Sequence, residues 1–181
     1  AATLTKPIKL SHLHNALLTV LTKGDATIKQ VESTPLVFDP GIAEKHPLRI
    51  LLAEDNIINQ KVALRFLERI GYRADLAFNG IEVLEALRRQ AYDVVLMDIQ
   101  MPDMDGVQAT LEIRRDFPKD RQPRIIAMTA NAMKDDHEKY LASGMEDYIV
   151  KPFKIEELVR VLLDSEPLPN SSPKVSESRN N

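Results

Sequence analysis

Side chains suited to anionic oxygen chemistry recur directly after short apolar segments. Glu54 and Asp55 follow one segment and Asp98 follows another, and Thr129 and Lys151 each follow a further segment. Carboxylates held close together repel one another, and a hard divalent cation such as Mg²⁺ relieves that repulsion through oxygen ligands. A lysine and a hydroxyl beside a metal-bound aspartate would position a phosphoryl group. The residue types therefore predict phosphoryl transfer, with Asp98 as the nucleophile.

The chemistry of Mg²⁺ suggests which residues bind the ion directly and which bind it through water. Asp55 and Asp98 are predicted to bind the cation directly, while the longer Glu54 acts through a water molecule. The backbone carbonyl of Gln100 is expected to complete the protein's ligands. Taken singly, each of these side chains could be a helix cap or a loop residue. Their occurrence together, after separate apolar segments, favours a shared site.

The apolar segments have the character of strands in a parallel sheet. They are short, mostly continuous rather than alternating, and separated by stretches of helical period, as expected for strands buried on both faces. The segments are 50–53, 74–78, 94–97, 125–128 and 148–150. Five such units predict an α/β fold, a doubly wound parallel sheet of flavodoxin-like order 2-1-3-4-5. In such a sheet the carboxyl ends of the strands meet at one edge, where the five side chains would gather.

Composition divides the chain into four parts. The regular pattern predicts a domain over 48–164, preceded by a proline-interrupted linker over 23–47. Residues 165–181 are rich in Ser, Pro and Asn, which predicts a disordered tail. The segment 5–18 repeats the Lys-Pro and Leu pattern of 150–163. Residues 1–22 are therefore interpreted as the last β-α unit of a preceding domain of the same kind.

The overall charge and composition exclude several classes of protein. Lys and Arg number 24 against 27 Asp and Glu, so no basic excess points to direct nucleic-acid binding. Cysteine is absent, which excludes disulfides and thiolate metal sites. No apolar run approaches the roughly 20 residues that a membrane helix needs. We therefore expect a soluble, cytoplasmic protein.

Four motifs resemble the receiver domain of two-component response regulators: ILLAEDN, VVLMDIQMPDMDG, IIAMTANAM and YIVKPF. The resemblance implies that Asp98 accepts a phosphoryl group and that Lys151 contacts it. It further implies that Thr129 and Tyr148 are the switch residues and that the peptide bond before Pro152 is cis. Glu54 stands where the family more often has Asp, which affects the arrangement of the metal's water.

The sequence EDNIIN is similar to receivers attached to hybrid histidine kinases. This implies a phosphorelay in which a histidine kinase or a histidine phosphotransfer protein donates the phosphoryl group. No kinase catalytic domain is expected in the chain, although a receiver catalyses its own phosphorylation and dephosphorylation. Phosphorylation would change the face built by the fourth helix, fifth strand and fifth helix of the domain. A membrane-tethered parent protein and a homodimer are compatible with this interpretation.

Three alternatives involve other uses of the same residues. A degenerate receiver would act only as a docking module, without phosphorylation. Asp103, Asp105 and Gly106 also resemble the signature of haloacid-dehalogenase-like phosphatases, but Pro102 rather than a buried strand precedes them. The same residues fit part of a calcium loop, whose first ligand position is taken by Met101.

Overall fold

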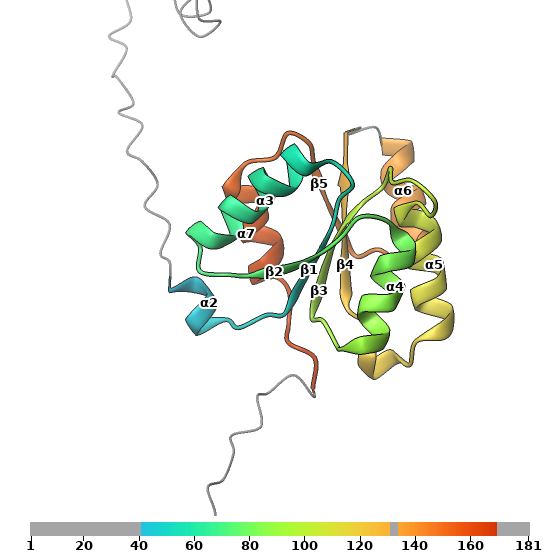
Figure 1. Ribbon diagram of the computed structural model, residues 1–181, viewed down its shortest axis with the longest axis horizontal. Helices are drawn as coiled ribbons and strands as arrows, with labels where there is room; N and C mark the ends of the chain where they lie inside the picture. Colours follow the sequence, from blue (N-terminus) through green and yellow to red (C-terminus); the bar gives the residue numbers. More distant parts are fainter. Residues whose placement is uncertain (1–40, 131–133, 170–181) are drawn as a thin grey trace, which may run out of the picture. The chain divides into compact units, whose positions relative to one another are not determined.

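The computed structural model describes residues 41–130 and 134–169. Its centre is a five-stranded parallel sheet of order β2-β1-β3-β4-β5, which confirms the predicted fold (Figure 1). The strands are β1 (Ile50–Ala53), β2 (Ala74–Ala77), β3 (Val94–Asp98), β4 (Arg124–Thr129) and β5 (Asp147–Val150).

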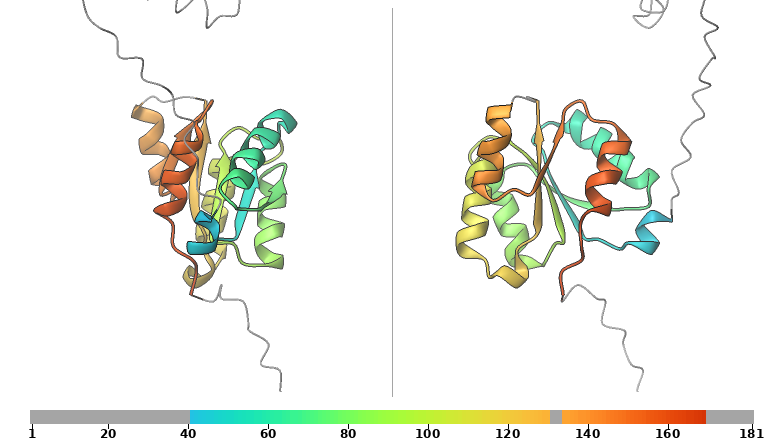
Figure 2. Two further views of the ribbon diagram at one scale, coloured as in Figure 1. Left: turned by 90° about the vertical axis from the view of Figure 1, so that its left-hand side faces the viewer. Right: turned by 180° about the vertical axis from the view of Figure 1, so that it is seen from behind.

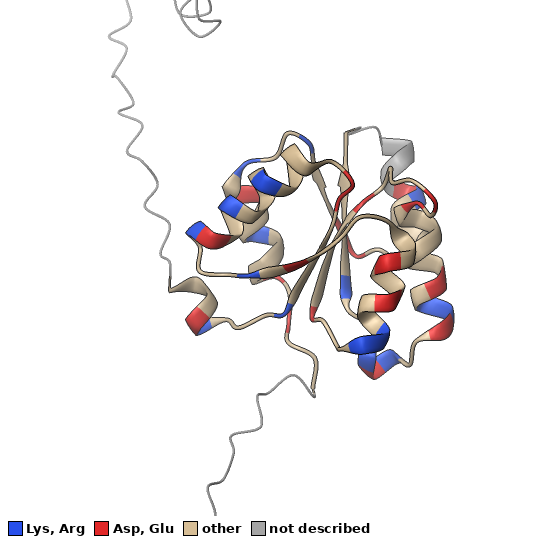
Figure 3. Ribbon diagram, in the orientation of Figure 1, with Lys and Arg blue, Asp and Glu red and all other residues tan. Residues whose placement is uncertain are grey.

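Helices cover both faces of this sheet. One side carries α3 (Ile57–Arg69) and α7 (Ile155–Leu163) (Figures 1 and 2). The other side carries α4 (Gly80–Arg89), α5 (Gly106–Asp116) and α6 (Lys134–Ser143). A short 3₁₀ helix, Lys119–Arg121, precedes β4. Charged residues of both signs are interspersed along the helices, as is usual for faces turned to solvent (Figure 3).

Burial differs between the central and the edge strands. Every residue of β1 and β3 is buried, as the continuous apolar segments predicted. The expectation of two buried faces is wrong for β2, where Asp75 and Leu76 are exposed. The order of the strands explains this, because β2 has a hydrogen-bonded neighbour only on the side of β1.

Three helix N-caps lie in the loops that follow strands. The side chain of Asn56 accepts hydrogen bonds from Ile58 and Asn59 at the start of α3, and Asn79 caps α4 in the same way. Asp105 caps α5. These bonds satisfy amide groups that a helix leaves without partners, and they fix each helix start at the carboxyl edge of the sheet.

The ordered domain extends beyond the predicted boundaries 48–164 at both ends. Within the predicted linker, α2 (Ile42–Lys45) packs its Ile42 against the core between the sheet, α3 and α7. His46 Nε2 lies 2.6 Å from the carbonyl oxygen of Ser165, a buried residue of the predicted tail. The composition of these flanks gave no sign of such contacts, because they depend on two segments that are distant in sequence.

The remaining domain predictions fall on other parts of the chain. Residues 1–22, and most of the predicted linker and tail, lie outside the described residues. None of the helices in the described ranges combines the length and apolar character that a membrane-spanning helix requires.

Candidate functional site

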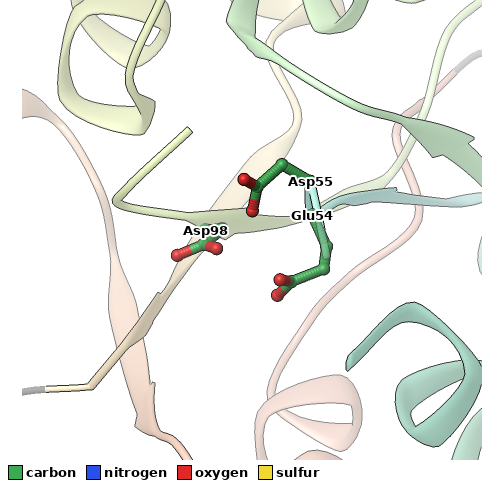
Figure 4. Close-up of side chains that lie close together, drawn as sticks. All are labelled: Glu54, Asp55 and Asp98. Atoms are coloured by element: carbon green, nitrogen blue, oxygen red, sulfur yellow. The ribbon is translucent and has the colours of Figure 1, made fainter. Parts of the chain in front are cut away.

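Three carboxylates meet at the carboxyl end of the sheet. Glu54 and Asp55 follow β1, and Asp98 is the last residue of β3, the strand paired with β1. One oxygen atom from each lies within 4.8 Å of the others. In Figure 4 the three side chains surround a common space. Adjacent parallel strands that end in register thus bring together residues far apart in the sequence.

The Glu54 side chain is held by the first turn of α3. Its Oε1 accepts hydrogen bonds from the side-chain amide of Asn59 at 2.9 Å and from the Asn56 backbone at 3.3 Å. The Gln60 side chain donates to the backbone carbonyl of Glu54 at 2.6 Å. Glu54 is consequently buried and fixed, whereas the neighbouring Asp55 is exposed.

A close backbone contact shapes the loop after Asp98. A side-chain Cβ at Gly106 would lie 2.2 Å from the carbonyl oxygen of Asp98, so only glycine fits there without displacing the backbone. Asp105 caps α5 by accepting a hydrogen bond from the Gln108 backbone at 2.8 Å. Among the described residues, the carboxylate cluster includes neither Asp103 nor Asp105. This geometry favours a turn and cap over the phosphatase and calcium-loop alternatives.

Lys151 links two of the buried carboxylates. Its Nζ lies 2.5 Å from Glu54 Oε2 and 2.7 Å from Asp98 Oδ2. Burial raises the pKa of the Asp98 carboxyl above its usual range; Lys151 opposes this effect and the charge of Glu54 adds to it. The backbone amide of Gln100 also donates to Asp98, at 3.2 Å. Asp98 is therefore a carboxylate whose negative charge is only partly compensated.

Thr129 lies at the carboxyl end of β4 and is buried. Its hydroxyl oxygen is 3.1 Å from the hydroxyl of Tyr140 on α6, a contact that sequence reasoning missed. Tyr140 belongs to a strongly charged stretch, and nothing in that local pattern identifies a partner on β4. Tyr148, the predicted switch aromatic, is partly buried on β5 and packs against the core beneath α4, α5 and α6.

These groups share a solvent-accessible cleft of about 680 Å³. All five residues first selected from the sequence line it, together with Asn56, Asn59, Gln100 and Tyr140. The peptide bond between Lys151 and Pro152 is cis, as predicted. The oxygen-only ligand set fits a hard divalent cation, because Mg²⁺ prefers carboxylate, carbonyl and water oxygens. A cation there, with Lys151 opposite, would bind a phosphoryl group.

Comparison with known proteins agrees with this geometry. Residues 50–163 match the family model of the response regulator receiver domain. The chain belongs to this family. The receiver is 44% identical over 130 residues to Histidine protein kinase 1 of Candida albicans, an alignment that covers 67% of this chain and 5% of the kinase. It is 45% identical over 117 residues to Hybrid signal transduction histidine kinase K of Dictyostelium discoideum, covering 61% and 10%.

Solved receiver structures are similar to the same region. The receiver domain of the sensor histidine kinase PA1611 from Pseudomonas aeruginosa is 46% identical, with a TM-score of 0.59 over 65% of this chain and 95% of that one. That structure holds a magnesium ion in its active-site cleft. The receiver of Saccharomyces cerevisiae Ssk1, crystallised with the histidine phosphotransfer protein Ypd1, is 29% identical with a TM-score of 0.59, covering 65% of this chain and 87% of that one.

The resemblance inferred from the motifs is thus confirmed, including its similarity to receivers of hybrid histidine kinases. The protein contains a receiver domain of the two-component phosphorelay class. The chain spans only 5% and 10% of the lengths of these two histidine kinases.

Proposed function

We propose that Asp98 accepts a phosphoryl group from a phosphohistidine. One observation carries the proposal: a buried carboxylate of raised pKa opens onto a solvent-accessible cleft, between a lysine and two further carboxylates. An Asp98 oxygen attacks phosphorus, a new P–O bond forms, and the P–N bond to the imidazole breaks. The neutral histidine leaves, and an aspartyl phosphate remains.

Lys151 and Thr129 serve the transferred group. In the structure the Lys151 ammonium is shared between Glu54 and Asp98. Once Asp98 carries a phosphoryl group, the same ammonium binds a phosphoryl oxygen and compensates its charge. The Thr129 hydroxyl, at the end of the adjacent strand, donates a hydrogen bond to another oxygen. Both interactions position charge in a partly desolvated cleft, where they are stronger than in water.

The carboxylate cluster is suited to Mg²⁺. Asp55 and Asp98 would hold the ion directly, Glu54 through a water molecule, and Gln100 through its backbone carbonyl. When bound, Mg²⁺ supplies positive charge that orients the phosphoryl oxygens and lowers the barrier to transfer. The PA1611 receiver, with its magnesium ion in the active-site cleft, supports this assignment.

The phosphoryl donor is a histidine kinase or a histidine phosphotransfer protein that docks beside the cleft. Ile57 and Ile58, on the first turn of α3, are 60% and 72% exposed, and Val62 is also exposed. They neighbour Asn56 and Asn59, which line the cleft. Exposed apolar residues beside a reactive site are typical of a protein-docking surface. The complex of the Ssk1 receiver with Ypd1 supports this class of partner.

Phosphorylation then alters a surface formed by α6, β5 and α7. Thr129 is drawn toward the aspartyl phosphate, and Tyr148 fills the space that Thr129 leaves. The register supports this pairing, because Tyr148 lies opposite Ala127 and Val150 lies opposite Thr129. Side chains alternate between the two faces of a strand, so positions 127 and 129 share one face of β4. The altered surface is the output of the switch.

We also infer the context of the domain. Its similarity to receivers of hybrid kinases supports a cytoplasmic receiver of such a protein. The repeat of the 150–163 pattern in 5–18 supports the interpretation of 1–22 as the last β-α unit of a preceding receiver-like domain. Direct nucleic-acid binding forms no part of the proposed function, and a homodimer remains a prediction.

Treatment with acetyl phosphate and Mg²⁺ tests the chemistry. Intact-mass measurement should show one added phosphoryl group, and trapping should place it on Asp98. Asp55→Asn should abolish or strongly reduce the Mg²⁺-dependent reaction, whereas Asp103→Asn should leave it unchanged. No mass gain in the wild-type protein would favour a pure docking module, and label on Asp103 would favour the phosphatase alternative.

Docking on α3 has a separate test. Ile58→Ala should slow transfer from a phosphorylated histidine phosphotransfer protein by roughly tenfold, as expected for a buried contact at an interface. Phosphorylation by acetyl phosphate should be unchanged, because the cleft stays intact. The control Leu111→Ala removes an exposed leucine from α5, on the other layer of helices. Equal slowing in both variants would contradict docking on α3.

A further inference from the structure

Tyr140 connects α6 to the reactive cleft. Its side chain is buried and lines the cleft, and its hydroxyl lies 3.1 Å from the hydroxyl of Thr129. Either hydroxyl can be the donor in this hydrogen bond. Thr129 is the residue that must contact the phosphoryl group if Asp98 accepts one. A hydrogen bond from α6 to Thr129 therefore couples this helix to the state of the cleft.

The carboxyl half of α6 holds Tyr140 in place. The Tyr140 carbonyl oxygen accepts hydrogen bonds from Ser143 Oγ at 2.7 Å and from the Met145 backbone at 3.1 Å. Just beyond the helix, Arg114 on α5 donates through Nε to the Gly144 carbonyl at 2.9 Å. A Cβ at Gly144 would lie 2.8 Å from Arg114, so the two elements are in close contact. Figures 1 and 2 show α5 and α6 side by side.

This anchoring makes the bond sensitive to movement of Thr129. An oxygen-to-oxygen distance of 3.1 Å is already longer than the 2.7–2.8 Å typical of hydroxyl hydrogen bonds. The bonds at the end of α6 fix the backbone of Tyr140, so its hydroxyl can follow Thr129 only by rotation of its own side chain. Movement of Thr129 away from Tyr140 would therefore take the two hydroxyls beyond hydrogen-bonding distance.

We propose that Tyr140 is a positioning residue that holds the Thr129 hydroxyl in the unphosphorylated state and is released when Asp98 is phosphorylated. Because the bond exists in one state only, it opposes the switch and sets how readily the cleft closes on a phosphoryl group. Its loss frees the Tyr140 ring and hence α6. The inference rests on the proposed function, since Thr129 has a phosphoryl partner only if Asp98 accepts one.

The test compares Tyr140→Phe with the wild-type protein and with Tyr92→Phe. Phenylalanine keeps the ring and removes only the hydroxyl. Tyr92 is also buried, and its hydroxyl donates to Asp75, a residue that does not line the cleft. The probe is beryllofluoride with Mg²⁺, an analogue of the phosphoryl group. Tyr140→Phe should bind it about fivefold more tightly, the factor expected for removing one hydrogen bond from the free state. Tyr92→Phe should bind it like the wild type.

A second comparison separates positioning from a general structural role. In a Thr129→Val background the hydroxyl partner of Tyr140 is gone, so adding Tyr140→Phe should leave the beryllofluoride affinity unchanged. The chain has four tyrosines, so labelling with 3-fluorotyrosine gives a small set of fluorine resonances. The resonance lost in Tyr140→Phe should shift when beryllofluoride binds to the labelled wild-type protein.

The outcomes distinguish this inference from the proposed function. Unchanged or weaker binding in Tyr140→Phe, or an equal gain in the Thr129→Val background, overturns the role of Tyr140 while phosphorylation of Asp98 stands. A Tyr140 fluorine resonance that does not shift when beryllofluoride binds would also overturn the role of Tyr140. A wild-type protein that takes up neither beryllofluoride nor a phosphoryl group overturns both.

Discussion

Asp93 directly precedes β3 and Asp98 is its last residue, and both are nearly inaccessible, with exposed fractions of 2% and 6%. Their surroundings differ. Asp93 accepts hydrogen bonds from the backbone and guanidinium of Arg49 and from the Leu168 backbone. Burial works against its charged form, but these bonds outweigh it and hold the pKa of Asp93 below its usual value. For Asp98, burial prevails and the pKa is raised.

The difference shows how the same residue type serves structure at one end of a strand and chemistry at the other. The oxygens of Asp93 are occupied by donors that belong to the fold, so its charge stabilises the native state. Asp98 lines a cleft and shares the Lys151 ammonium with Glu54. Part of its negative charge therefore has no compensating cation among the residues that the structure describes. Such incomplete compensation reduces stability, and a divalent metal ion would supply the missing positive charge.

Removing the carboxylate charge at either end of β3 should have very different effects on phosphorylation. Asp98→Asn should abolish phosphorylation by acetyl phosphate, because an amide is not an effective nucleophile. Asp93→Asn should still be phosphorylated at temperatures where it is folded, because the cleft is at the other end of β3. Intact-mass spectrometry measures both. Phosphorylation that persists in Asp98→Asn would place the acceptor elsewhere.

Asp93→Asn should have the largest effect on stability. The substitution removes the charge that pairs with Arg49 and leaves partly buried donors poorly matched to the amide group that replaces the carboxylate. We expect the free energy of unfolding at pH 7 to fall by about 2–3 kcal/mol, measured by urea denaturation. The depressed pKa of Asp93 gives stability that is present above about pH 4 and is lost as the pH falls through the folded value. The difference from wild type should therefore shrink on acidification.

A matched control for this measurement is Asp120→Asn, since Asp120 is exposed beside β4. We expect a change within roughly 0.5 kcal/mol. Similar losses in both variants would show that Asp93 contributes no more than a surface carboxylate.

Leu168→Pro probes a single donor to Asp93. The Leu168 amide donates to Asp93 Oδ1 at 2.8 Å, and proline has no amide hydrogen. The expected loss is about 1 kcal/mol in the free energy of unfolding, the usual contribution of one hydrogen bond. Leu168→Ala keeps the amide and separates this effect from the loss of the side chain. If both variants lose the same stability, the amide bond is unimportant.

Asp98→Asn should have a small stability effect of opposite sign. The raised pKa means that the native state binds a proton more tightly than the unfolded chain. Stability therefore decreases as the pH rises from about 4 through the folded pKa, and the loss remains at pH 7. Removing the charge should raise the free energy of unfolding at pH 7 by roughly 0.5–2 kcal/mol in metal-free buffer. This gain in the free energy of unfolding should disappear below about pH 4. If Asp98→Asn is less stable than the wild type at pH 7, the contrast between Asp93 and Asp98 is wrong.

The sequence by itself determined the parts of the protein that depend on local pattern. Continuous apolar segments and helical periods specified five β-α units, and polar residues directly after the segments placed the candidate site at one sheet edge. The site could be predicted because parallel strands end together, so a residue such as Asp98 needs only its place on its own strand. The same rule predicted that Lys151, directly after β5, lies close to Asp98.

Only the tertiary structure decided which side chains contact one another across elements. The hydrogen bond between Tyr140 and Thr129 depends on how α6 packs on the sheet, and no short-range pattern records that packing. The role of Asp93 depends on Leu168, which composition had assigned to a tail. Hydrophobic periodicity specifies which face of an element is buried, but individual polar contacts follow from small displacements between packed elements, which the sequence pattern does not specify.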